Sequence, residues 1–177
     1  MARNIEIKAR IENIDVCHER AVALADDGPV VITQDDTFFL CRKGRLKLRA
    51  FSQEKGELIY YLRPNQTGPK ESFYLISSTT DPDALRESLS LAYGEAGRVR
   101  KTRTLFLAGR TRIHLDRVEG LGEFLELEVV LEDGEEPQTG KAIAHDLMDK
   151  LGIQPYQLIE GAYVDLQAKA AEQGVGA

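Results

Sequence analysis

The chain has 177 residues, with 42% hydrophobic and 29% charged side chains and a formal net charge of −6 at pH 7. This length suits one domain that buries a sizeable core without disulfides or a structural metal. No apolar run approaches the roughly 20 residues of a membrane-spanning helix, and the negative charge argues against bulk nucleic-acid binding. Cys17 and Cys41 lack a metal-ligand spacing and are expected to stay reduced, which predicts a cytoplasmic protein.

The first segment alternates between apolar and charged residues and predicts a strand. Residues 4–11 read NIEIKARI, and successive strand side chains point to opposite faces, so the charges of this segment share one face. A helix over residues 13–25 is expected next, because Asn13 or Asp15 can cap its start. The chain thus begins with a two-faced strand and a helix that needs an apolar surface to cover.

The following segments predict more strands. Residues 29–33 and 37–40 indicate two short strands around a turn that Asp35 and Asp36 are expected to form. Residues 45–51 (RLKLRAF) alternate strictly and align three basic side chains on one face. An ionic face that recurs from strand to strand predicts either a sheet with one wet side or a barrel with a charged interior.

The middle of the chain adds strands over residues 57–63 and 71–77, with a loop at 64–69 between them. A helix is expected over residues 81–94, where an aspartate cap is followed by a proline and a glycine ends the apolar pattern. Another strand follows over residues 98–107. Within it, the alternation places Lys101 and Arg103 on one face and Arg98 and Arg100 on the other.

Residues 112–128 predict a β-hairpin, because two alternating runs flank the glycine-containing turn at 119–122. The opposite face of both arms is apolar. The ionic face carries Arg112, His114 and Asp116 on the first arm, and Glu126 and Glu128 on the second.

The last part of the chain predicts a helix over residues 138–151 and a short closing helix or extended segment over 156–166. Residues 168–177 are expected to fray. We therefore assign residues 1–167 to one domain and residues 168–177 to a tail.

The helices and the strands together favour one fold class. The apolar strand faces supply the surface that the amphipathic helices must cover, which leaves the ionic faces on the other side of the sheet. About eight antiparallel strands tend to close. The prediction is an α+β fold, with a closed eight-stranded antiparallel β tunnel that has a charged interior and helices packed outside.

The charges are also segregated along the chain. Residues 42–49 carry five Arg or Lys and no acid, and residues 98–117 carry seven with Asp116 as the single acid. Residues 119–136 then carry eight Asp or Glu and no base. This segregation predicts a charged ligand.

An ordered set of motifs resembles the CYTH superfamily, the triphosphate tunnel metalloenzymes. The superfamily includes class IV adenylyl cyclases, thiamine triphosphatases and inorganic triphosphatases. The resemblance covers residues 4 to about 165. The motifs are Asn4-Ile-Glu-Ile-Lys8, Lys47-Leu-Arg49, Lys101-Thr-Arg103, Arg112-Ile-His-Leu-Asp116 and Gly120-Leu-Gly-Glu-Phe-Leu-Glu-Leu-Glu128.

The resemblance implies an eight-stranded tunnel, an Mg²⁺ or Mn²⁺ requirement and a small triphosphate ligand, in a monomer or a homodimer. Arg and Lys satisfy phosphate oxygens by charge-assisted hydrogen bonds, and carboxylate oxygens are the ligands that Mg²⁺ prefers. The expected substrate-binding residues are Lys8, Lys47, Arg49, Arg63, Lys70, Lys101, Arg103 and Arg112. The expected metal ligands are Glu6, Asp116, Glu126 and Glu128, and the expected catalytic residues are Glu6, Lys8, Glu126 and Glu128.

The opening motif departs from the family pattern, because Asn4 stands where the first glutamate of Glu-x-Glu-x-Lys is usual. Asparagine brings no charge, so one metal site should be weaker or lost. We expect hydrolysis of a terminal phosphate; the alternatives are cyclisation of ATP to cyclic AMP and pyrophosphate, and a non-catalytic module that binds polyphosphate or nucleotide. Retention of Glu6, Glu126 and Glu128 argues against the last of these.

Overall fold

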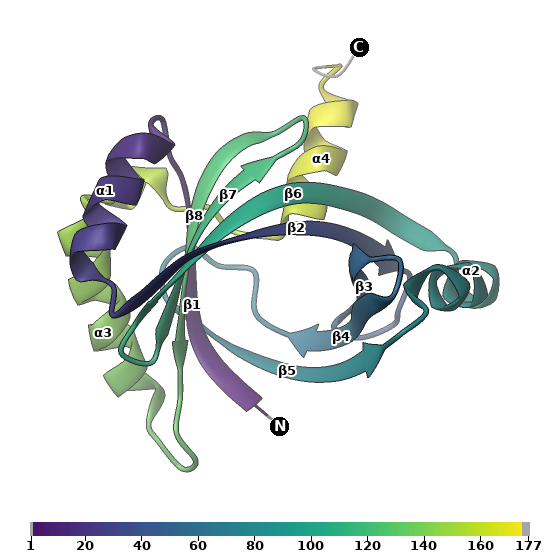
Figure 1. The fold of residues 1–177 in the computed structure, drawn as a ribbon, viewed down its shortest axis with the longest axis horizontal. Coiled ribbons are helices and arrows are strands. Elements are labelled where there is room, and N and C mark those ends of the chain that lie inside the picture. The colour runs from purple at the N-terminus through teal and green to yellow at the C-terminus, as the bar shows by residue number, and fades with distance from the viewer. Residues whose placement is uncertain (1, 175–177) are drawn as a thin grey trace.

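The computed structural model describes residues 2–174, and its alternating segments form eight strands that close into a barrel (Figure 1). The order around the barrel is β1-β5-β4-β3-β2-β6-β7-β8, and every neighbouring pair is antiparallel. This confirms the predicted fold class. The strands are β1 (Ala2–Arg10), β2 (Asp27–Phe39), β3 (Arg45–Ser52), β4 (Lys55–Leu62), β5 (Lys70–Thr79), β6 (Glu95–Ala108), β7 (Thr111–Val118) and β8 (Gly122–Val130).

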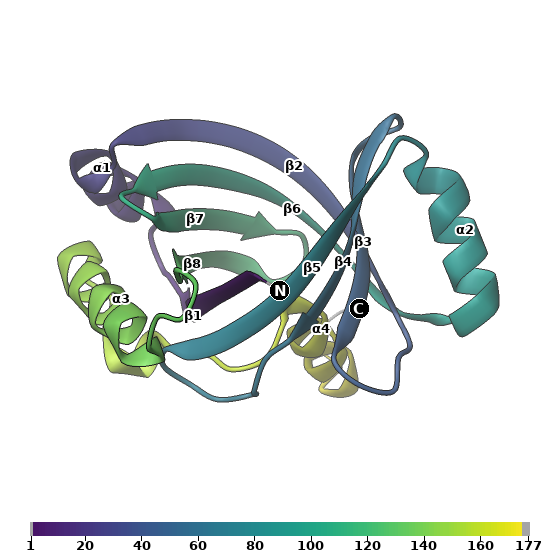
Figure 2. The ribbon, with the colours of Figure 1, turned by 90° about the horizontal axis from the view of Figure 1, so that it is seen from below.

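Helices cover the outside of the barrel. In Figures 1 and 2, α1 and α3 lie together on one side, and α2 lies on the opposite side. Asn13 caps α1 by accepting hydrogen bonds from the backbone N–H groups of Asp15 and Val16, as its position predicted. The helices are α1 (Ile14–Leu24), α2 (Pro82–Tyr93), α3 (Pro137–Leu151) and α4 (Tyr163–Glu172), with a 3₁₀ turn at Pro155–Gln157.

The main core lies between the barrel wall and the α1–α3 pair. Ile7, Ile113 and Leu127 are fully buried on the outward faces of β1, β7 and β8, and they share a cluster with Cys17 and Met148 of the helices. Burial of each large aliphatic side chain contributes about 1.5–3 kcal/mol to folding. Because a strand has only two faces, this core turns the ionic faces of the same strands into the barrel.

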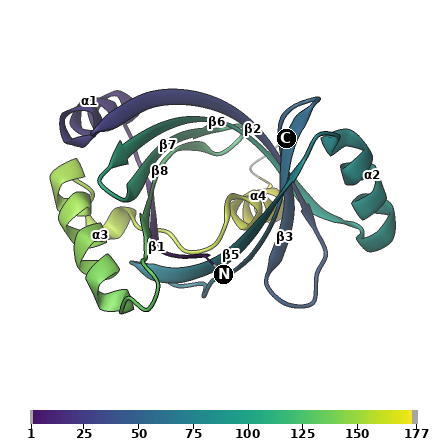
Figure 3. The same ribbon diagram turned by 60° about the horizontal axis from the view of Figure 1, so that its bottom comes forward.

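The α4 helix closes one end of the barrel. Its first residues, Tyr163 and Val164, are buried in a second cluster with Phe38, Val99 and Phe124 from the strand ends. Figure 3 looks into the barrel and shows α4 behind the opening. We call this the closed end and the opposite end the open mouth.

Two sequence expectations are corrected by the structure. The predicted turn at Asp35 and Asp36 is wrong, because β2 runs unbroken from Asp27 to Phe39 and pairs with both β3 and β6. The expected fraying from residue 168 is wrong as far as Glu172, since α4 continues to that residue. Of the remainder of the predicted tail, Gln173 and Gly174 form a turn, and residues 175–177 lie outside the described part of the chain.

Among the described residues, the structure has no helix that is both long enough and apolar enough to cross a membrane.

Candidate active site

The barrel interior holds a cavity of about 260 Å³ whose wall takes residues from all eight strands and from the start of α4. Ten of the predicted site residues line it. They are Glu6, Lys8, Lys47, Arg49, Arg63, Lys101, Arg103, Arg112, Glu126 and Glu128.

Glu126 lies at the centre of the acidic part of this wall. Its carboxylate is 3.1 Å from Lys8 Nζ, 3.4 Å from Arg103 Nη2 and 3.2 Å from His114 Nδ1. Burial alone would raise the pKa of Glu126, but Lys8, His114 and Arg103 outweigh it and hold the pKa well below its usual range. Glu126 is therefore a buried carboxylate that stays ionised.

His114, Glu126 and Glu128 form a cluster that could hold a metal ion. They come from the β7–β8 hairpin, where His114 stands opposite Glu126, and one ligand atom from each lies within 4.8 Å of the others. Two carboxylates and an imidazole fit a divalent cation, since carboxylate oxygens suit Mg²⁺ and Mn²⁺ and an imidazole suits the softer transition metals. The residues present thus fit the Mg²⁺ or Mn²⁺ that the family resemblance implies.

The other two predicted metal ligands have different neighbours. Glu6 lines the cavity and is paired with the guanidinium of Arg63. Asp116 accepts hydrogen bonds from Arg103 Nε and Nη2, both at 2.7 Å, and from the Tyr163 hydroxyl at 2.7 Å. These contacts outweigh the effect of burial and lower the pKa of Asp116 to about 2. Asp116 orients Arg103 and does not line the cavity.

A second group of charges lies on the wall formed by β2, β3 and β6. Asp36, which is 1% exposed, accepts hydrogen bonds from Lys47 Nζ at 3.2 Å, Lys101 Nζ at 3.0 Å and Arg49 Nε and Nη2 at 2.8 Å. Burial, together with Arg49 and Arg103, lowers the pKa of Lys101 to about 7. One buried carboxylate thus holds three basic side chains in place inside the barrel.

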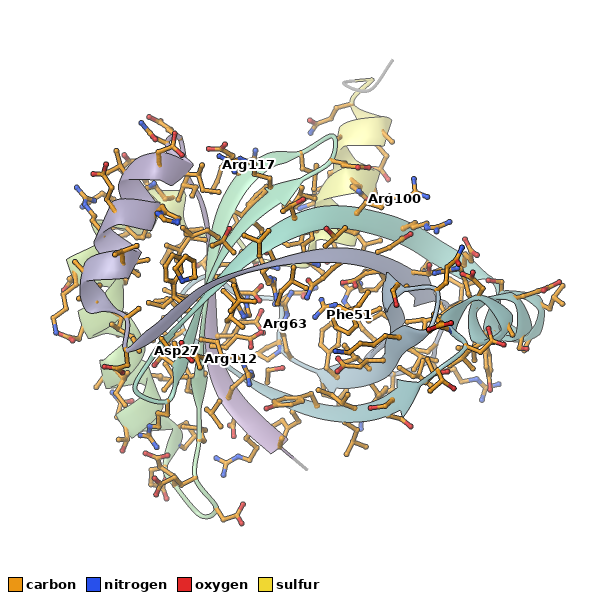
Figure 4. All side chains as sticks on the ribbon, in the orientation of Figure 1. Asp27, Phe51, Arg63, Arg100, Arg112 and Arg117 are labelled. Atoms are coloured by element: carbon orange, nitrogen blue, oxygen red, sulfur yellow. The ribbon has the colours of Figure 1, made fainter. Side chains whose placement is uncertain are left out.

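The alternation of side chains along β6 predicted correctly which of its cations point into the barrel and which point outward. Arg98 and Arg100 lie outside the barrel, where both pair with Asp35, and Figure 4 shows Arg63 pointing into the opening while Arg100 lies outside. Lys70 is buried, but its Nζ donates to the Gln66 carbonyl at 2.9 Å, and it does not line the cavity. Its role in substrate binding stays a prediction.

Several residues of the cavity were not assigned a role from the sequence. Asp36 was missed because two adjacent aspartates are typical of turns. Tyr163 was missed because its position depends on how α4 docks. His114 was placed on the inner face by parity, but its proximity to both glutamates required the strand register. No local pattern marked the role of any of the three.

A closed antiparallel barrel with a cation-lined interior and a carboxylate–imidazole cluster defines a tunnel protein. The family model of the CYTH domain matches residues 2–163, so the chain belongs to that family. This confirms the resemblance noted in the sequence motifs.

Three relatives illustrate the similarity. Adenylate cyclase CyaB of Aeromonas hydrophila is 25% identical over 170 residues, covering 90% of this chain and 85% of that protein. The PH1012 protein of Pyrococcus horikoshii OT3 has a TM-score of 0.81 at 25% identity, covering 92% of this chain and 98% of that one. HpAC1 from Hippeastrum, described with a dominant triphosphatase activity, has a TM-score of 0.63 at 18% identity, covering 90% and 91%, and this likeness shows the fold alone.

Proposed function

We propose that the protein is a divalent-metal-dependent enzyme that hydrolyses the terminal phosphate of a triphosphate bound in the barrel. The observation that carries this proposal is the convergence of basic side chains from different strands on a cavity that also holds a carboxylate–imidazole cluster. A triphosphate carries about four negative charges near neutral pH and matches this arrangement of donors.

Different residues of the chain would bind the phosphates and the metal. Lys47 and Arg49 supply donors for phosphate oxygens from β3, Lys101 and Arg103 supply them from β6, and Arg112 supplies them from β7.

On the β7–β8 part of the wall, Glu126 and Glu128 with His114 would hold the metal, and Lys8 Nζ lies 3.1 Å from the Glu126 carboxylate. A divalent cation held there supplies positive charge that stabilises the charge developing on the phosphate oxygens. Because most of these side chains are buried inside the barrel, their charges interact more strongly than charges in bulk water would.

A second candidate function is cyclisation of ATP to cyclic AMP and pyrophosphate, which the similarity to adenylate cyclase CyaB favours. Hydrolysis is ranked first because of Asn4. Because asparagine is uncharged, the negative charge that is usual at this position in the family is absent, and its buried Oδ1 has no hydrogen-bond partner within residues 2–174. Attack by water needs only a small nucleophile, whereas cyclisation must also hold the ribose in line with the α-phosphorus.

Product analysis tests the proposal and separates the two reactions. The protein is incubated with ATP, or with linear tripolyphosphate, in the presence of Mg²⁺ or Mn²⁺. Hydrolysis predicts more orthophosphate than pyrophosphate from ATP, and cleavage of tripolyphosphate as well. Stoichiometric cyclic AMP and pyrophosphate, with tripolyphosphate left intact, would instead establish the cyclase.

A further inference from the structure

Tyr163, the first residue of α4, brings an aromatic ring to the cavity from an element that is not part of the sheet. It lines the cavity and is 5% exposed. Its ring centroid lies 4.0 Å from Lys8 Nζ and 5.6 Å from Lys101 Nζ, and its hydroxyl donates a hydrogen bond to Asp116 at 2.7 Å. One side chain thus contacts basic residues of β1 and β6, two strands that are not neighbours in the barrel.

The ring is a different kind of partner for a lysine from a carboxylate. Lys8 Nζ lies 3.1 Å from Glu126, and Lys101 Nζ lies 3.0 Å from Asp36, so each lysine already has an acidic partner that offsets its charge. An aromatic ring attracts a cation within about 6 Å of its centroid through its quadrupole, yet it carries no net charge. The ring can therefore hold both ammonium groups and leave their charge available to an anionic ligand.

This constraint matters most for Lys8. A lysine side chain is flexible and loses much rotamer freedom when it is held in one geometry. Glu126 is the acidic partner of Lys8 and also belongs to the proposed metal cluster. The Tyr163 ring is not part of that cluster, so its contact with Lys8 does not depend on what Glu126 binds.

The hydroxyl of Tyr163 acts on a third cation through Asp116. The Asp116 carboxylate accepts hydrogen bonds from Arg103 Nε and Nη2, both at 2.7 Å, in addition to the one from the hydroxyl. Asp116 is 0% exposed, and in such a buried network each hydrogen bond restricts the others. The hydroxyl thus fixes the carboxylate, and the carboxylate fixes the plane of the Arg103 guanidinium.

We propose that Tyr163 is a positioning residue for the phosphate-binding cations of the cavity. Its ring holds Lys8 and Lys101 in place. Its hydroxyl holds Arg103 in place through Asp116. This inference rests on the proposed function, which assigns the phosphates of the substrate to the cations of the cavity. It follows that α4, through its first residue, contributes to the affinity for a triphosphate.

Two substitutions separate the ring from the hydroxyl. Tyr163→Phe removes only the hydroxyl, and Tyr163→Leu removes the ring as well. Calorimetry with linear tripolyphosphate, with and without Mg²⁺, should show affinity about threefold to tenfold lower for Tyr163→Phe and about a hundredfold lower for Tyr163→Leu. In steady-state assays with Mg²⁺, KM should rise by similar factors while kcat changes less than about twofold, because the lost contacts bind substrate and transition state alike.

Val164→Ala is the matched control. Val164 is the next residue of α4, is 6% exposed and packs in the same cluster as Tyr163, but it does not line the cavity. This variant should unfold at a lower urea concentration than the wild type, because it removes buried methyl groups. It should bind tripolyphosphate as tightly as the wild type does.

The outcomes distinguish positioning from a purely structural role. A structural role lowers the fraction of folded protein, so the apparent kcat of Tyr163→Leu would fall at unchanged KM and unchanged affinity, and this result would overturn the proposal. Tyr163→Phe keeps the packing of the ring and tests the hydroxyl even if Tyr163→Leu does not fold. Wild-type affinity of Tyr163→Phe would therefore overturn the proposal too, and both results leave the proposed function intact. A wild type that neither binds nor cleaves a triphosphate would overturn the proposed function itself.

Discussion

Glu126 and Glu128 provide the negative charge of the proposed metal site. Glu126 is buried among three basic groups, and Glu128 lies 2.7 Å from Arg112 Nε. Replacing either residue by Gln keeps the shape but removes charge that a hard cation needs. We expect turnover in each variant to fall by about two orders of magnitude or more.

The measurement is steady-state turnover with Mg²⁺ and with Mn²⁺, alongside Mn²⁺ binding followed by electron paramagnetic resonance. Glu132→Gln is the control, since the Glu132 side chain is 84% exposed and lies outside the cavity. Full activity of Glu128→Gln, or of the wild type in excess chelator, is incompatible with the proposed site.

Asp36 is the second residue on which the site depends, because it is the buried partner of Lys47, Arg49 and Lys101. Asp36→Asn leaves these cations without their counter-charge, and we expect it to lower the free energy of unfolding by about 3–5 kcal/mol at pH 7. Added tripolyphosphate should restore part of the loss, because a polyanion replaces the missing charge. Urea denaturation with and without tripolyphosphate measures both effects.

Asp35→Asn is a matched control, since Asp35 is the adjacent residue and pairs with Arg98 and Arg100 on the outer face. It should cost no more than about 1 kcal/mol.

The three basic neighbours hold the pKa of Asp36 well below its usual value. The ionised Asp36 carboxylate therefore contributes to the free energy of unfolding above its unfolded-state pKa of about 3.9, and this contribution is lost as the pH falls below that value. The wild type should show this loss and Asp36→Asn should not. Equal stability of Asp36→Asn and Asp35→Asn would contradict this role.

The α4 helix closes the barrel with its buried residues Tyr163 and Val164, and the Tyr163 side chain makes polar as well as apolar contacts there. Tyr163 donates a hydrogen bond to Asp116, its ring lies 4.9 Å from that of Phe124, and Lys8 Nζ lies 4.0 Å from the ring centroid. We expect Tyr163→Ala to lower the free energy of unfolding by about 3–5 kcal/mol. Tyr156→Ala, at a position that is 82% exposed, should change it by less than about 0.5 kcal/mol. Similar urea midpoints for the two variants would show that α4 does not hold the closed end.

The strands differ in how well the sequence predicted them. Strict alternation in β1, β3 and the β7–β8 hairpin identified which side chains enter the barrel, because the period of a strand is fixed at two. The same logic failed for β2. Its two aspartates favour a turn locally, but the strand continues, because it pairs with β3 and β6, and Asp36 contacts cations from both of these strands, which are distant in sequence. The length of β2 thus depends on non-local pairing that no local pattern encodes.

In the cavity, the sequence predicted which charged residues line the wall better than it predicted which residues they pair with. Lys8, Lys101 and Arg103 line the cavity as expected. The division of the carboxylates between metal binding and positioning was not predictable. It depends on which cation each one meets, and Asp116 meets Arg103 only through the β6–β7 register.

For the whole molecule, the buried lysines predict a pH dependence. Burial is the main cause that lowers the pKa of Lys101 to about 7 and that of Lys47 to about 8. Both side chains are charged below these values and lose their charge as the pH rises through them. Because kcat/KM reports the free enzyme, its value for a triphosphate should fall on the alkaline side with an apparent pKa of about 7–8. A flat profile up to about pH 9.5 in a steady-state assay would contradict a role for these lysines in binding.

The most direct test of the tunnel as a metal-dependent triphosphate site is a crystal structure with Mn²⁺ and a non-hydrolysable triphosphate. Anomalous scattering locates Mn²⁺ independently of the protein coordinates. The account predicts a peak about 2.0–2.3 Å from carboxylate oxygens of Glu126 and Glu128, with the phosphates against Lys47, Arg49 and Lys101. A peak elsewhere, or a triphosphate bound outside the barrel, would contradict it.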